Sequence, residues 1–137
     1  MNRMVLVDTT VWIDFFRGTE TRQVSQLESL IQERADLCIC GLILTEVLQG
    51  IGSDAEYRMV RSYLTQLLRL PLEDAHYEAA ANIYRTLRKE GVTIRKSIDC
   101  LIAAIAIEAG APILHNDRDF AYIAANFPLQ VYADTND

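Results

Sequence analysis

Apolar and polar positions along the chain follow two patterns, one typical of buried strands and one of amphipathic helices. Residues 4–8, MVLVD, form an apolar run that ends on an acid, as expected of a central parallel strand covered on both faces. Further strands are predicted at residues 37–40, 69–72, 111–115 and 129–132. Helical spacing predicts helices at residues 11–17, 20–34, 41–51, 54–68, 73–89 and 118–126. This alternation favours a parallel sheet with right-handed crossovers, flanked by helices in a three-layer α/β/α fold.

Residues 97–120 join two isolated acids through a further apolar helix and a strand. Ser97 is predicted to be the N-cap of this helix, and Gly110 with the proline that follows ends it. Asp99 falls in the first helical turn, and Asp117 comes where the strand ends. Ligands of open α/β sheets bind outside the carboxyl ends of the strands, so we expect these two acids to meet in one crevice.

Length and composition indicate one domain. At 137 residues, of which 50% are apolar, the chain can bury a substantial core, predicted for a domain at residues 1–133 with a short flexible tail at 134–137. The longest apolar run, residues 100–107, is far shorter than the roughly 18 residues of a membrane span. Residues 4–7 are too short for the core of a signal peptide. We therefore expect a cytoplasmic protein that does not enter a membrane.

The three cysteines are predicted to be reduced. An odd number does not suit a disulfide framework, and Cys38 and Cys40 alternate along a predicted strand. This Cys-x-Cys pair would give zinc only two of its four ligands, with no third ligand nearby, so a structural role is favoured.

The charge of the chain is unevenly distributed. The formal net charge is −6, which argues against loose attraction to nucleic acid over the whole surface. Residues 85–96 contain five basic residues and one acid, a net charge of +4, so the rest of the chain carries −10. This basic strip ends three residues before Asp99, where it could bind phosphates beside an acidic pocket. A solvated helix face is the alternative interpretation.

Four acids stand apart from other charges, unlike the rest of the nineteen: Asp8, Glu46, Asp99 and Asp117. A buried carboxylate costs several kcal/mol unless it is paired or bound to a metal, so four such placements need a cause. Helix capping, worth about 1 kcal/mol, could account for each of the three aspartates. Glu46 lies in the middle of a helix, where the alternative is an exposed acid on the solvent side.

A divalent metal would account for all four acids together. If they converge, their mutual repulsion is offset by a hard cation such as Mg²⁺ or Mn²⁺, which favours carboxylate and water oxygens. Such a site can activate water for attack on a phosphodiester without a protein nucleophile. The other candidates for catalysis, His76 and His115, lie on a predicted amphipathic helix and strand and are interpreted as structural.

With these residues in hand, the chain resembles PIN-domain ribonucleases, and more narrowly the VapC-like toxins of type II toxin-antitoxin pairs. The resemblance rests on VLVDTTVWIDFFRG at residues 5–18, LTEVLQG at 44–50 and SIDCLIAAIAIEAGAPILHNDRDF at 97–120. It implies that Asp8, Glu46, Asp99 and Asp117 hold Mg²⁺ or Mn²⁺ and are catalytic, with Thr9 or Thr10 as hydrogen-bonding support. Asp119 is a lower-ranked fifth acid, with an exposed helix residue as the alternative.

The resemblance also implies an activity and partners: metal-dependent cleavage of structured RNA such as tRNA or rRNA, a homodimer, and a cognate antitoxin. The predicted RNA-binding residues are the bases Arg85, Arg88, Arg95 and Lys96. A groove for an antitoxin helix is predicted on Trp12, Phe15, Phe16, Leu27, Leu30 and Ile31. An aromatic stripe of this kind is more often part of the core.

Three other functions are compatible with parts of the pattern. A haloacid dehalogenase-type phosphatase would use Asp8 as a nucleophile, with Thr10 two residues later, but the late lysine expected in that fold is missing because Lys96 is the last lysine. A receiver-like module would also need such a lysine and paired acids after the first strand. A catalytically silent PIN-like module that binds RNA or protein is the third alternative.

Overall fold

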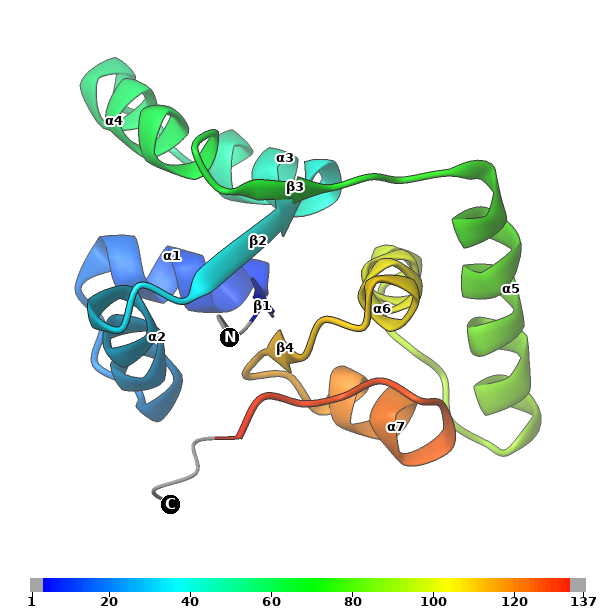
Figure 1. Ribbon diagram of the computed structural model, residues 1–137. Helices are drawn as coiled ribbons and strands as arrows, with labels where there is room; N and C mark the ends of the chain where they lie inside the picture. The colour runs from blue at the N-terminus through cyan, green and yellow to red at the C-terminus, as the bar shows by residue number, and fades with distance from the viewer. Residues whose placement is uncertain (1–3, 134–137) are drawn as a thin grey trace.

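Four short parallel strands form the centre of the molecule in the computed structural model, which describes residues 4–133 (Figure 1). In chain order they are β1 (Met4–Val7), β2 (Asp36–Cys40), β3 (Leu68–Leu70) and β4 (Ile113–Leu114). Their order in the sheet is β3-β2-β1-β4, and each neighbouring pair is parallel. The predicted parallel sheet is confirmed, and the tail predicted at residues 134–137 lies outside the described residues.

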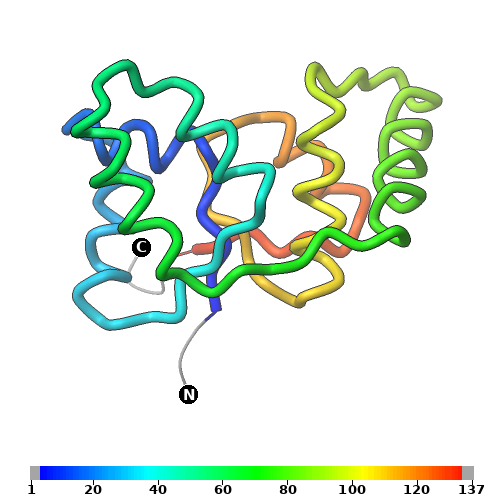
Figure 2. The backbone as a smooth tube through the Cα atoms, turned by 90° about the horizontal axis from the view of Figure 1, so that it is seen from above, coloured from blue at the N-terminus to red at the C-terminus, as the bar shows by residue number. Residues whose placement is uncertain are grey.

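Helices cover both faces of this sheet, as predicted for a three-layer fold. The helices are α1 (Thr9–Arg17), α2 (Arg22–Gln32), α3 (Gly41–Gln49), α4 (Asp54–Leu64), α5 (Asp74–Lys89), α6 (Ser97–Ala109) and α7 (Arg118–Asn126). Figures 1 and 2 show α1, α2 and α4 on one side of the strands and α5 and α6 on the other. No helix in residues 4–133 is long and apolar enough to cross a membrane.

Strand β1 and helix α6 form the centre of the core. The side chains of Val5, Leu6 and Val7 are inaccessible to solvent, as expected of a strand with neighbours on both edges and helices on both faces. Helix α6 lies between the sheet and α5 (Figure 1), and its alanines at positions 103 and 106 are buried. Small side chains at these positions allow α6 to pack closely against its neighbours.

The sheet has one point where its connections change direction. From β1 the chain proceeds through β2 to β3 at one edge, and then returns to place β4 on the opposite side of β1. Leu6 pairs with Ile113 and Val7 with Leu114, so these two strands end at the same level. Ligands of open α/β sheets bind at such a switch point, outside the carboxyl ends of the strands.

Two local predictions are wrong. Lys96, not Ser97, is the N-cap of α6: its backbone is extended and its carbonyl accepts the N–H of Asp99, so Ser97 is already helical. The strand predicted at residues 129–132 is reduced to a single bridge between Val131 and Ile113, because the chain meets the sheet edge beside the two-residue strand β4.

The aromatic residues of α1 pack mainly into the core. Trp12 is fully buried and stacks on Phe16 with ring centroids 5.9 Å apart, and Tyr63 of α4 approaches it edge-on. Leu27 and Leu30 of α2 are also fully buried. In this conformation Trp12, Leu27 and Leu30 cannot contact an antitoxin, which corrects that part of the predicted groove. Phe15, Phe16 and Ile31 are half-buried and reach the surface.

Replacement of Trp12 tests this core assignment. Trp12→Ala is expected to lower the free energy of unfolding by about 3–5 kcal/mol because it leaves a large cavity. Trp12→Phe is expected to lower it by only about 1 kcal/mol, since it also removes a buried indole N–H without a hydrogen-bond partner in residues 4–133. Urea unfolding of the isolated chain measures both values. Equal stability of Trp12→Ala and wild type would contradict the assignment.

Candidate metal centre

Three aspartates converge at the carboxyl ends of β1 and β4. Asp8 directly follows β1 and is the N-cap residue of α1, although its side chain makes no capping hydrogen bond. Asp117 follows β4 by three residues and is the N-cap of α7, where its Oδ1 accepts the N–H of Asp119 at 2.9 Å. Asp99 lies in the first turn of α6 and is buried. All three acids lie where helix dipoles stabilise negative charge, yet capping accounts only for Asp117.

Glu46, on α3, is connected to this group by a hydrogen bond from Thr9, the residue that follows Asp8. The hydroxyl of Thr9 donates to Oε1 of Glu46 at 2.7 Å, and the hydroxyl of Thr10 donates to Oδ2 of Asp8 at 3.2 Å. Glu46 is half-buried and not an exposed surface acid. The two threonines therefore fix one oxygen each of Glu46 and Asp8.

The electrostatic interactions of these acids show that they form one cluster. Burial raises the pKa of Asp8 to about 6; the N–H of Thr9 and the Thr10 hydroxyl oppose this rise, while Glu46 and Asp117 add to it. Burial also raises the pKa of Asp99 to about 7, with further increases from Asp8, Asp117 and Glu46 and a decrease from Lys96. Each buried aspartate is thus destabilised as an anion by the other acids.

Asp119, which the sequence ranks below the other four acids as a candidate ligand, is buried. Its side chain is 3% exposed, which excludes the alternative of an exposed helix residue. Carboxylate oxygens of Asp99, Asp117 and Asp119 lie within 4.8 Å of one another, and among residues 4–133 this is the one group of three or more potential ligands so close together. Asp8 and Glu46 lie outside this tight group and adjoin it through the interactions described above.

The residues present fit a divalent cation. Asp99 Oδ2 is buried and has no hydrogen-bond partner in the described part of the chain. An orphaned carboxylate oxygen among other acids is costly unless a cation neutralises it. All candidate ligands are carboxylates, the donor type that hard cations prefer. The three cysteines are buried, unpaired in disulfides and absent from the group, which agrees with the structural role predicted for them.

One basic residue is bound to the cluster in a way that the sequence did not indicate. Arg95 donates from Nη2 to Asp117 Oδ1 at 2.8 Å and from Nε to Asp119 Oδ2 at 3.1 Å. Its guanidinium is therefore engaged with acids, although its side chain is exposed like those of Arg85, Arg88 and Lys96. The separation of 22 and 24 residues between Arg95 and its acids leaves no local pattern. The one feature of the sequence that could have predicted a contact of Arg95 with the cluster is its position just before the helix that carries Asp99.

The two histidines have partners that explain them structurally. The buried His76 accepts the N–H of Glu73 at Nδ1, which caps α5, and its Nε2 pairs with Glu108 of α6. His115 accepts the N–H of Asp117 at 3.0 Å and so shapes the turn that carries this acid. Both observations agree with the predicted structural roles.

The fold and the acidic cluster together define a PIN domain, and the PIN domain family matches residues 5–126. VapC ribonuclease Mb1587 of Mycobacterium bovis is 39% identical over 129 residues, which cover 93% of this chain and 96% of that protein. Ribonuclease VapC11 of Mycobacterium tuberculosis is similar to the same extent. The chain belongs to the PIN-domain family and, within it, to the VapC ribonucleases, as its sequence motifs predicted.

A solved structure confirms the fold independently. The structure of VapBC2 from Rickettsia felis bound to a DNA fragment from their promoter superimposes with a TM-score of 0.74, covering 94% of this chain and 97% of that one. The sequences are 18% identical, so this likeness concerns the fold. The PIN-domain fold excludes the phosphatase and receiver alternatives, because those functions belong to other folds.

The raised pKa values predict how stability depends on pH without metal. Folding raises the pKa of Asp8 and Asp99 from 3.8 to about 6 and about 7, so the folded chain binds protons that the unfolded chain releases. The stability of the metal-free chain should therefore fall as the pH rises from about 4 to about 7. Asp99→Asn should flatten this dependence and stabilise the metal-free chain at pH 8 by about 1–2 kcal/mol.

Thermal unfolding in EDTA between pH 5 and 8 measures this effect, with wild type and Asp99→Asn compared at each pH. The exposed Glu28, on α2, offers a matched control, and Glu28→Gln should retain the pH profile of the wild type. An Asp99→Asn variant less stable than wild type at pH 8 would contradict the electrostatic account.

Proposed function

We propose that the protein is a metal-dependent endoribonuclease, the toxin of a toxin-antitoxin pair, which cleaves structured RNA such as tRNA or rRNA with Mg²⁺ or Mn²⁺. The observation that carries this proposal is the buried acidic cluster at the β1/β4 switch point, with an unpartnered carboxylate oxygen on Asp99. Two VapC ribonucleases are 39% identical to the chain over nearly its whole length, which supports the same chemistry. Because tRNA and rRNA are found in the cytoplasm, we propose that the protein acts there.

The proposed mechanism assigns separate tasks to the acids. Asp8, Glu46, Asp99 and Asp117 would surround the cation. Asp119, whose carboxylate lies within 4.8 Å of those of Asp99 and Asp117, would offer it a further oxygen. When bound, a divalent cation lowers the pKa of its water and polarises the phosphodiester. Thr9 donates to Oε1 of Glu46, and the other oxygen, Oε2, would accept the proton of the attacking water.

The basic strip provides the proposed path for RNA. Arg85 lines the same surface hollow as Ser97, the first residue of α6, so the end of α5 lies beside the loop that leads to Asp99. Lys96 is exposed and lowers the pKa of Asp99, which shows that its charge acts at the cluster. Phosphates bound by Arg85, Arg88 and Lys96 would therefore bring the backbone of the RNA to the acids.

Cleavage of total RNA by the purified, antitoxin-free chain tests the proposal. Discrete fragments are expected with Mg²⁺ or Mn²⁺ and none with EDTA. Asp8→Asn and Asp99→Asn should reduce the rate by about 100-fold or more, because each removes a charged ligand. Glu28→Gln, an exposed acid on α2, should cleave at the wild-type rate. Undiminished cleavage by both aspartate variants would refute the site, and a folded wild type without activity would favour the silent binding module.

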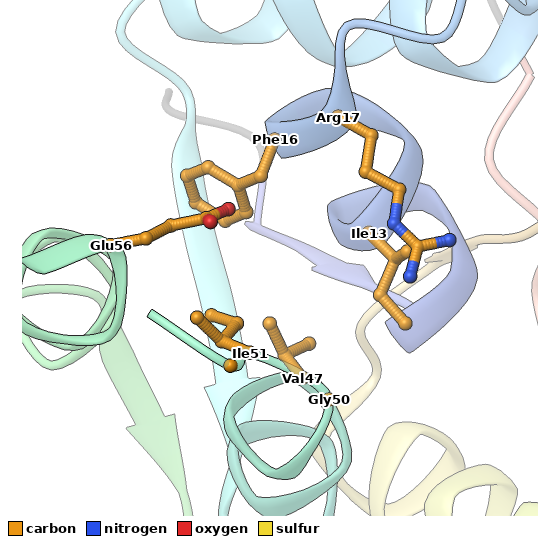
Figure 3. A pocket seen from close by; sticks show the side chains of 8 residues that line it. Ile13, Phe16, Arg17, Val47, Gly50, Ile51 and Glu56 are labelled. Atoms are coloured by element: carbon orange, nitrogen blue, oxygen red, sulfur yellow. The ribbon is translucent and has the colours of Figure 1, made fainter. Parts of the chain in front are cut away.

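We further propose where an antitoxin binds. A surface hollow of about 270 Å³ lies between α1, α3 and α4, with Ile13, Phe16 and Ile51 among its lining residues. In Figure 3, Arg17 and Glu56 extend from opposite sides of this apolar base. An apolar side chain of a partner helix, flanked by charges of both signs, would fit such a hollow. The neighbouring structures named VapBC support a partner of this kind, and the chain is proposed to act as a homodimer.

Substitution in this hollow tests the antitoxin site. Ile51→Glu should weaken binding of the cognate antitoxin by about 10-fold or more, because it places a charge on the apolar base. Met59→Glu changes the exposed Met59, which does not line the hollow, and should bind as the wild type does. Isothermal titration of the antitoxin into each folded variant measures the difference. Equal affinity of Ile51→Glu and wild type would place the antitoxin elsewhere.

A further inference from the structure

Arg95 connects two segments that are distant in the sequence and that both carry acids of the cluster. It lies in the loop before α6, and its acceptors Asp117 and Asp119 lie at the start of α7. Besides its two guanidinium bonds, its backbone N–H donates to Asp119 Oδ2 at 3.2 Å. The loop that precedes Asp99 is thereby tied to the turn that presents the other two acids.

The hydrogen bonds of Arg95 engage one oxygen of each acid and leave the other free. Asp119 Oδ2 accepts both the backbone N–H and Nε of Arg95. Asp117 Oδ1 accepts Nη2 of Arg95 and the backbone N–H of Asp119. No residue between 4 and 133 donates a hydrogen bond to the second oxygens, Asp117 Oδ2 and Asp119 Oδ1. Each carboxylate thus has one fixed oxygen and one available oxygen.

Burial shows from which side Arg95 reaches the acids. The side chain of Arg95 is 56% exposed, whereas those of Asp117 and Asp119 are 15% and 3% exposed. The guanidinium therefore approaches from the solvent side, and the orphaned Asp99 Oδ2 lies on the buried side. Fixing carboxylates from outside is how residues around a metal site orient its ligands.

We infer that Arg95 is a positioning residue of the metal site, which orients Asp117 and Asp119 so that one oxygen of each stays available to the cation. This inference rests on the proposed function. Two effects of Arg95 on cation affinity have opposite signs. Its positive charge repels a divalent cation, but the guanidinium is largely exposed and its charge is screened by solvent. The orientation of ligands by outer hydrogen bonds is typically worth about 10–100-fold in affinity, so orientation outweighs repulsion.

Isothermal titration of Mn²⁺ into the protein, without RNA, measures cation affinity directly. It separates ligand orientation from charge repulsion, because the two effects of Arg95 change that affinity in opposite directions. Arg95→Gln should bind Mn²⁺ about 10-fold more weakly than wild type, since the backbone N–H of residue 95 keeps part of the orientation. Lys96→Gln removes the same charge from the next residue and should bind Mn²⁺ as tightly as wild type or more tightly. Equal or tighter binding by Arg95→Gln would overturn the inference and make Arg95 a mere counter-ion.

Two further measurements keep the result interpretable. Circular dichroism and thermal unfolding in EDTA test whether Arg95→Gln is folded. If it is not folded, Arg95→Lys is used in its place. This variant should lose about threefold in Mn²⁺ affinity, because an ammonium group lacks the planar fork that bonds both acids. RNA cleavage by Arg95→Gln should recover to within about threefold of wild type at saturating Mn²⁺. Unchanged Mn²⁺ affinity with a raised KM for RNA would instead assign Arg95 to RNA binding and overturn the inference.

The two proposals can fail separately. Wild type that binds Mn²⁺ without cleaving RNA would refute the ribonuclease function, while weaker binding by Arg95→Gln would still uphold the role of Arg95. Wild type that binds and cleaves, together with an Arg95→Gln variant of equal affinity, would refute only the role of Arg95. Asp99→Asn lacks one of the proposed cation ligands and serves as the negative control for Mn²⁺ binding. A wild type that binds no more Mn²⁺ than this variant would overturn both proposals.

Discussion

Repulsion among buried carboxylates is the constraint on which the rest of this structure depends. Asp8, Asp99, Asp117 and Asp119 are all buried or nearly so, and burial with mutual repulsion raises the pKa of two of them. A fold tolerates such a group only if the surrounding elements hold it rigidly. Helix starts, two threonine hydroxyls and one arginine provide that support here, so the stability of the scaffold maintains a site that is itself unfavourable without a cation.

The topology of the sheet explains why the acids meet. Only parallel strands bring all their carboxyl ends to one edge, and only the reversal between β1 and β4 leaves a crevice there. Helix α6 returns along the sheet so that its first turn, with Asp99, reaches the same edge. Glu46 reaches this edge because α3 begins directly after β2.

Much of this arrangement could be predicted from the sequence because each acid leaves a local signal. Asp8 ends an apolar run, Asp99 interrupts an apolar helix at its start, and Glu46 is isolated in an uncharged stretch. The burial of Asp119 was not predicted, because the sequence does not show that α7 turns its first residues inward. A stripe of apolar residues likewise cannot distinguish core from partner surface, which is why Trp12, Leu27 and Leu30 were assigned to a groove although the structure buries them. The role of Arg95 depends on a contact across more than twenty residues and needed the structure.

The two strands at the switch point, β1 and β4, lie far apart in the described chain, and this has a consequence for biosynthesis. Asp8 is synthesised before Asp117 and Asp119, which follow it by more than a hundred residues. A nascent chain that has not yet exposed β4 cannot complete the acidic cluster, and contacts of such long sequence separation form late in folding. The acidic cluster of this fold, and any activity that depends on it, is therefore complete only after residues 113–119 have been synthesised and β4 has paired with β1.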